Sequence, residues 1–226
     1  MTDKMYVETF DDGPGGWFAW AGPSRNMPLQ IEDGVAVSRG PWAVDANHAP
    51  PGAGYLHLLF VLPTAHLTEL PQETREFSGP NRFVEGGFPI DFTDAKITVR
   101  LKGEVERKGA KLVLLAQGKV GDRTINYLLT GQPLEITPDW SEQTLTLAPD
   151  LRQWTCLGAR HDMLDFYGWG DIADVLRHVD VDLIFVFFMP DVVPLPPMDG
   201  DHHRMRPQMH YPIDESLLPE GVVMLD

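Results

Sequence analysis

The fold is indicated most clearly by ITVRLKGEV (97–105), KLVLLAQGK (111–119), TINYLLT (124–130) and QTLTL (143–147). β-Branched and apolar residues recur at every second position in the first two of these segments, which is the period of a half-buried strand. The polar turns between the first three segments, ERKGA and VGDR, are short. Parallel neighbours would need a crossover of a dozen or more residues. The stretch from Ile97 to Leu147 therefore predicts an antiparallel meander.

Further strand-like runs lie on both sides of this stretch. They cover residues 6–10, 31–39 with a bend at Gly34, 54–62, 181–189 and 221–226. The run VDLIFVFFM at 181–189 is the most apolar in the chain and is rich in β-branched and aromatic residues, so it predicts a central core strand. Helical spacing of apolar residues occurs at 171–178, which is the one predicted helix.

These elements predict an all-β fold in one domain that covers residues 1–226. Many short strands with a single helix favour two antiparallel sheets packed face to face, a β-sandwich of the jelly-roll type. A closed barrel is the alternative, because strand periodicity does not distinguish a closed sheet from two open ones. The segments 63–91 and 190–220 are rich in proline and are predicted to be long loops.

The charge balance limits the classes of partner. The chain of 226 residues has 33 acidic and 18 basic side chains, a formal net charge of −15. Binding to nucleic acid rests on neutralising several phosphates with Lys and Arg, so no nucleic acid is expected as a partner. An anionic membrane surface is disfavoured for the same reason. A neutral sugar or Ca²⁺ is compatible with this net charge. The alternative interpretation is that the charge serves only to keep the protein soluble.

The cysteine content and the N-terminal sequence point to the cytoplasm. Cys156 is the single cysteine, so no internal disulfide is possible, which fits a reducing compartment. Its apolar setting, QWTCLG, is more typical of a small core residue than of a nucleophile. The first ten residues contain no apolar signal segment, and no run reaches the ~18 apolar residues of a membrane span. A soluble, cytoplasmic protein is expected.

Three segments suggest a family. VETFDDGPGGW (7–17), ITPDWSEQTLTL (136–147) and GVVMLD (221–226) resemble the opening strand and glycine turn, a Trp-containing strand entry and the terminal strand of jelly-roll carbohydrate-binding modules. Those modules belong to the galactose-binding-like superfamily. The resemblance implies that the first and last strands are neighbours. It also implies binding of a neutral carbohydrate without catalysis.

The same resemblance implies a structural Ca²⁺ ion between the terminal strands. The matching acidic positions are Glu8, Asp11, Asp12 and Asp226. Ca²⁺ takes 6–8 oxygen ligands, and irregular backbone beside a glycine turn can supply carbonyl groups. The alternative interpretation is an ordinary acidic turn on an acidic protein.

Aromatic residues in loops are the candidate sugar-binding groups, because a pyranose ring can stack its C–H face on an aromatic ring. Trp17 and Trp20 lie in a segment rich in glycine and proline, and Trp169 and Tyr167 lie in DFYGWGD with Arg160 shortly before. Trp169 is the strongest single candidate. Further aromatics are Trp42, Tyr55, Trp140 and Trp154, of which Trp140 is predicted to be a core residue because it precedes a strand.

Two other functions stay open. Arg160, His161, Asp162 and Asp165 could form the active site of a hydrolase or lyase, with a general base among them. The proline-rich loops could instead make subunit contacts in a homo-oligomer or a larger assembly. The histidine and aspartate residues between 199 and 210 match no established zinc spacing. The sequence contains no GxSxG, P-loop or GxGxxG fingerprint.

Overall fold

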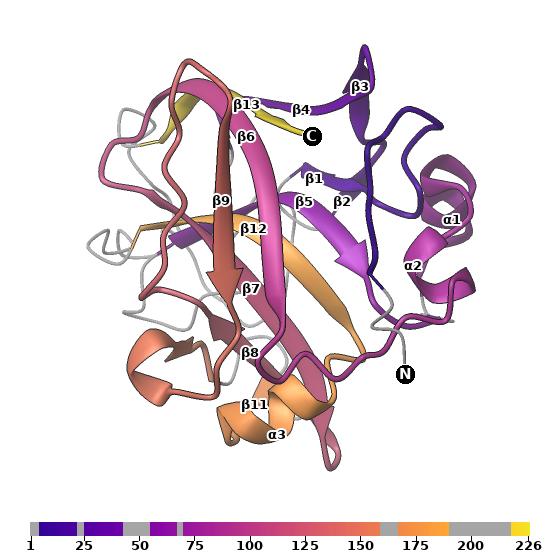
Figure 1. Cartoon of the computed structure of the whole chain (residues 1–226), viewed down its shortest axis with the longest axis vertical. Coiled ribbons are helices and arrows are strands. Elements are labelled where there is room, and N and C mark those ends of the chain that lie inside the picture. The colour runs from indigo at the N-terminus through magenta and orange to yellow at the C-terminus, as the bar shows by residue number, and fades with distance from the viewer. Residues whose placement is uncertain (1–4, 22–24, 43–54, 67–69, 159–166, 190–217) are drawn as a thin grey trace, which may run out of the picture.

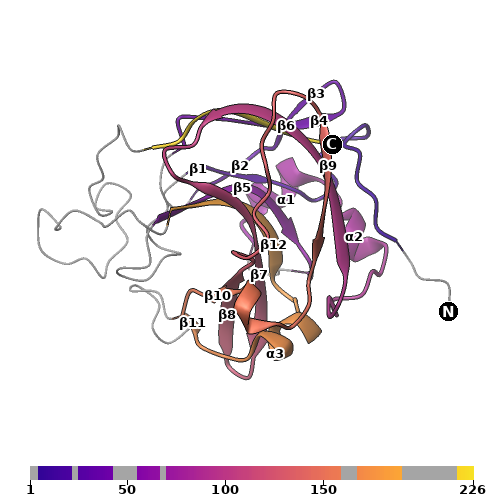
Figure 2. The same ribbon diagram turned by 60° about the vertical axis from the view of Figure 1, so that its left-hand side comes forward.

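The computed structural model describes residues 5–21, 25–42, 55–66, 70–158, 167–189 and 218–226. Two mostly antiparallel sheets face each other, with the main hydrophobic core between them (Figure 1, Figure 2). Both sheets are open. The predicted two-sheet β-sandwich is therefore confirmed, and the alternative of a closed barrel is wrong.

The six-stranded sheet has the order β10-β8-β7-β12-β5, and β11 pairs with β8. Its strands are β5 (Tyr55–Pro63), β7 (Lys111–Val120), β8 (Arg123–Leu128), β10 (Thr155–Cys156), β11 (Tyr167–Gly168) and β12 (Asp182–Met189). Strand β12 lies between β7 and β5, as its apolar sequence predicts. Both faces of this sheet are covered. Its inner face contributes Leu114 and Phe187 to the main core, and its outer face carries a second cluster with Leu115 and Val186, here called the outer core.

The five-stranded sheet has the order β3-β4-β13-β6-β9. Its strands are β3 (Gln30–Glu32), β4 (Val35–Arg39), β6 (Lys96–Glu106), β9 (Ser141–Thr146) and β13 (Glu220–Leu225). The predicted meander is therefore wrong at its first and last steps: β6 and β9 pair with each other in this sheet, whereas β7 and β8 pair in the six-stranded sheet. The burial patterns explain the separation: β6 alternates between exposed and buried residues, whereas Leu112–Gly118 of β7 are buried throughout. A strand with one buried face, such as β6, and a strand with two buried faces, such as β7, need different surroundings, even though they are consecutive in the sequence.

Helices occupy part of a segment that was predicted to be a loop. Helices α1 (Gln72–Ser78) and α2 (Arg82–Glu85) lie within 63–91, and the predicted helix at 171–178 is present as α3 (Ile172–Arg177). A short 3-10 turn covers Leu151–Gln153. Helix α1 buries Thr74 and Ser78 and has no apolar stripe, so hydrophobic periodicity does not reveal it. No helix in the described ranges is long and apolar enough to cross a membrane.

The N-terminal prediction is wrong. The first strands in the described residues are β1 (Ala19–Ala21) and β2 (Arg25–Met27), and residues 6–10 form no strand. The partners of β13 are β4 and β6, so the terminal strands do not pair as the resemblance implies. Phe10 has a φ of 56°, which is incompatible with an extended strand. The predicted bend at Gly34 is a hairpin turn, because Asp33 and Gly34 have φ values of 50° and 76°.

Candidate functional site

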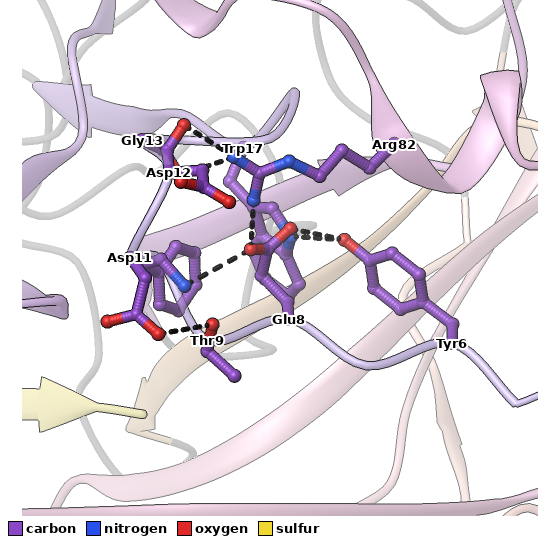
Figure 3. Close-up of polar contacts among 9 residues, drawn as sticks. Tyr6, Glu8, Thr9, Asp11, Asp12, Gly13, Trp17 and Arg82 are labelled. Atoms are coloured by element: carbon purple, nitrogen blue, oxygen red, sulfur yellow. Dashed lines mark hydrogen bonds and ion pairs between the residues drawn. The ribbon is translucent and has the colours of Figure 1, made fainter.

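The predicted calcium ligand Glu8 is already bonded within the chain (Figure 3). Its carboxylate accepts hydrogen bonds from the Tyr6 hydroxyl at 3.0 Å and from the Phe10 N–H at 3.1 Å, and it forms an ion pair with Arg82 of α2. The Glu8 side chain is only 6% exposed. Burial is the main cause that raises the pKa of the Tyr6 hydroxyl above its ordinary value. These contacts fasten the N-terminal segment to α2.

The other predicted calcium ligands have separate partners. Asp11 accepts a hydrogen bond from the Thr9 hydroxyl at 3.0 Å, and the Asp12 carbonyl accepts one from Arg82 at 2.6 Å (Figure 3). Asp226 follows β13 and pairs with Arg100 of β6. Among the described residues, no group of three or more His, Cys, Asp or Glu side chains could hold a metal ion. The Ca²⁺ ion stays a prediction.

Most of the predicted aromatic ligands are turned into the protein. Trp17 is 7% exposed, donates its Nε1–H to the Tyr6 hydroxyl at 3.0 Å and stacks on Phe185 with an interplanar angle of 4°. Tyr167 is buried, and Trp20 is half-buried against the outer core. These rings offer little free face to a ligand.

Three other tryptophans differ in burial: two are buried and one is half-buried, namely Trp42, Trp154 and Trp140. Trp42 and Trp154 are buried, and the Trp154 Nε1–H donates to the Ala148 carbonyl at 2.9 Å. The prediction that Trp140 lies in the core is wrong, because this residue is half-buried on the five-stranded sheet. There Arg100 and Lys102 lie over its ring at 4.4 and 4.8 Å from the centroid. The side chain of Tyr55 lies outside the description.

Trp169 is the exception. It is 74% exposed, and it is the one aromatic among the large exposed hydrophobic side chains of the described residues. Its indole lies against Gly158: a Cβ added there would come within 2.5 Å of the indole Nε1 and Cε2 atoms. Gly158 also has a φ of 66°, a conformation that glycine adopts without strain. Glycine at this position thus lets the backbone support the ring from behind.

Replacing Gly158 by Ala should lower stability and displace the indole. The left-handed conformation costs an L-residue about 1–2 kcal/mol, and the clash with Trp169 adds to this cost. Gly121→Ala is the matched control, because Gly121 has a φ of 65° and nothing lies within 4 Å of an added Cβ. Urea unfolding should show a clearly larger loss for Gly158→Ala. Equal losses would mean that the Gly158–Trp169 contact is not maintained in solution.

A row of three polar side chains crosses the outer face of the six-stranded sheet. Asn126 of β8 lies opposite Gln117 of β7, and Gln117 lies opposite Asp182 of β12. Their exposed fractions are 0%, 3% and 9%. Residues two positions away, such as Leu115 and Ile184, belong to the outer core, so all three side chains share its face. We call Asn126, Gln117 and Asp182 the outer row.

Two members of the outer row have unpaired polar atoms. Asn126 Nδ2 and Oδ1 and Asp182 Oδ1 are buried, with no hydrogen-bond partner in the part of the chain that the structure describes. Burial raises the pKa of the Asp182 carboxyl to about 8, so this group is protonated at neutral pH. Buried polar groups nearly always have partners, and each exception requires an explanation.

The sequence interpretation missed the outer row, although the chain contains a signal for it. Each member is a polar residue inside a strongly apolar strand: LLAQG for Gln117, TINYL for Asn126 and VDLIF for Asp182. The alignment of these three residues can be seen only when the order of the strands and their register are known.

The alternative catalytic residues cannot be placed. Arg160, His161, Asp162 and Asp165 lie outside the described residues, as do the histidine and aspartate residues at 199–210. The hydrolase or lyase activity and the subunit contacts through the proline-rich loops at 63–91 and 190–220 stay predictions, and residues 190–217 of the second loop lie outside the described residues.

Cys156 has the environment of a packing residue. Burial is the main cause that raises the pKa of its thiol, which disfavours the nucleophilic thiolate. The neighbouring Tyr127 hydroxyl donates to the Gly170 carbonyl at 2.7 Å, and burial raises the pKa of this hydroxyl to about 12.

Among the described residues, the two candidate features are the exposed Trp169 indole and, separately, the buried outer row with its unpaired polar atoms. Comparison of the chain with known proteins finds no matching family model, no similar curated protein and no similar solved structure.

Proposed function

We propose that the protein binds a neutral carbohydrate without transforming it, and that Trp169 is the ring on which the sugar stacks. The observation that carries the proposal is the 74% exposure of this indole against a supporting glycine. Leaving a large apolar ring in water forgoes the burial free energy of about 25 cal/mol per Å². A ligand with an apolar face recovers that free energy when it covers the ring.

The geometry suits a stacking ligand. Because Gly158 supports the indole, the ring offers a flat surface and loses little rotamer freedom when a ligand binds. The net charge of −15 favours an uncharged ligand over an anionic one. A pyranose meets both conditions, since it has an apolar C–H face and no charge.

Trp169→Ala should weaken binding of a neutral sugar at least about tenfold, equivalent to about 1.4 kcal/mol. The measurement is calorimetric titration with D-glucose, D-galactose, D-mannose, N-acetyl-D-glucosamine, lactose and cellobiose. Trp140→Ala is the matched control, because that indole is half-buried beneath Arg100 and Lys102. Sugar binding that survives in Trp169→Ala and is lost in Trp140→Ala would contradict the assignment of the ring.

A further inference from the structure

Residues 5–9 run along the surface of the molecule without belonging to either sheet (Figure 1, Figure 2). Tyr6 packs against Phe83 and Glu8 is buried at the Arg82 ion pair, whereas the other three residues of the run are exposed. Such alternation is typical of an extended strand. No main-chain N–H or C=O group of residues 5–9 forms a hydrogen bond with the described parts of the chain. We call residues 5–9 the free edge.

We propose that the free edge is a docking site for an extended, positively charged peptide segment of another protein, which pairs with it as an added β-strand. Unpaired donors and acceptors along an extended run are a template for strand addition. The inward contacts of Tyr6 and Glu8 hold the run in place before a partner arrives, which lowers the entropy that docking costs. The inference is independent of sugar binding at Trp169.

The exposed side chains of the free edge lack the protection that natural edges usually have. Charged side chains, proline and bulges keep most exposed edges from pairing. Here the exposed residues are Met5, Val7 and Thr9, and none of them is charged. Met5 is 79% exposed and Val7 is 61% exposed, and both lie on the same side of the run because they are two residues apart. An added strand with apolar residues at alternate positions would cover both side chains.

Charge favours a basic partner over a second copy of the chain. The free edge is followed by Asp11 and Asp12, which are exposed. Exposed Asp33 lies close to them, since a Cβ added at the next residue, Gly34, would come within 2.5 Å of Asp11 Oδ1. Two copies paired here would bring together two chains with a net charge of −15, which repel each other. Lys and Arg side chains of a partner would instead be attracted to these carboxylates.

Fluorescence anisotropy with the full-length chain and the labelled peptide KRKTVTVTV tests the proposal. We expect saturable binding that is at least tenfold tighter than that of EDETVTVTV at the same ionic strength. Two methylated forms of KRKTVTVTV carry backbone N-methyl groups, one on its threonines and the other on its valines. A paired strand turns only one of its two edges toward the protein. One methylated peptide should therefore lose at least tenfold in affinity, and the other should not.

Val7→Lys is the matching change in the protein, because it places a charge on the free edge. It should weaken binding of KRKTVTVTV at least tenfold. Leu151→Lys is the matched control: this side chain is 62% exposed, and its 3-10 turn lies on the opposite side of the molecule in Figure 1. Both substitutions change the net charge by the same amount. Both replace exposed side chains, so both variants should keep the wild-type Tm.

Three results would overturn the proposal. They are the absence of saturable KRKTVTVTV binding, equal affinities of the two methylated peptides, and equal weakening by Val7→Lys and Leu151→Lys. Analytical ultracentrifugation of the chain alone tests the other occupant. A wild-type dimer that Val7→Lys dissociates and Leu151→Lys does not would show that a second copy occupies the free edge, and would overturn the assignment of a basic partner.

Discussion

Arg82→Met is expected to lower the free energy of unfolding by about 3 kcal/mol, because removal of one partner leaves a buried charge uncompensated. The stranded group is the Glu8 carboxylate, whose side chain is 6% exposed, whereas that of Arg82 is 34% exposed. The Asp12 carbonyl loses a hydrogen bond in the same variant. Urea unfolding monitored by tryptophan fluorescence measures the change.

Arg39→Met is the matched control for this prediction. Arg39 forms an ion pair with Glu32 at 2.7 Å, but both side chains are about half exposed, 46% and 52%. Exposed pairs contribute about 0–1 kcal/mol, so the control should lose far less stability. A loss in Arg82→Met no larger than in Arg39→Met would show that the N-terminal segment is not fastened through Glu8. Glu8→Gln/Arg82→Met should recover part of the loss, because it removes the stranded charge.

Asp182→Asn is expected to make the protein more stable above neutral pH, by up to about 5 kcal/mol at pH 8. Burial raises the pKa of the Asp182 carboxyl from its ordinary value of 3.8 to about 8. Between these values the unfolded chain releases a proton that the folded protein retains. The free energy of unfolding is therefore unaffected by the ionisation of Asp182 below about pH 4, and it falls as the pH rises from there to about 8. Asparagine does not titrate and escapes this loss.

The measurement is the free energy of unfolding in urea at several pH values from 4.5 to 9. The difference between Asp182→Asn and the wild type should grow by up to about 1.4 kcal/mol per pH unit and level off above pH 8. Asp182→Leu should show the same pH dependence, since it also removes the carboxyl. A difference that does not change with pH would mean that Asp182 ionises normally in the folded protein.

Several elements could be predicted from local sequence because their faces are buried in a simple way. VDLIFVFFM predicts a strand covered on both sides, and β12 lies between β7 and β5. Apolar spacing at 171–178 predicts α3, which buries Ile172, Val175 and Leu176. Local patterns fail at α1, which lacks an apolar stripe, and at residues 6–10, where side-chain bonds of Glu8 replace strand pairing.

The candidate site was predictable only in part. Trp169 could be singled out because it lies among glycines and acids in a segment that was predicted to form no regular strand, although Tyr167–Gly168 form the two-residue strand β11. The same reasoning selected Trp17, which is buried because it packs against the nearby Phe10 and against Phe185 of the distant strand β12. Exposure of an aromatic ring depends on what packs over it, and a short loop sequence does not contain that information.

The sequence by itself determined that the protein is an all-β fold, because alternating and continuous apolar runs must bury their faces between sheets or inside a barrel. The tertiary structure decided that the sheets are open and form a sandwich. It decided as well which strands are neighbours: β6 and β7 are consecutive in sequence yet lie in different sheets. It also brought Asn126, Gln117 and Asp182 into one row. The physical reason is that strand pairing and register are set by contacts between distant segments, so residues on three strands align only after the sheets have formed.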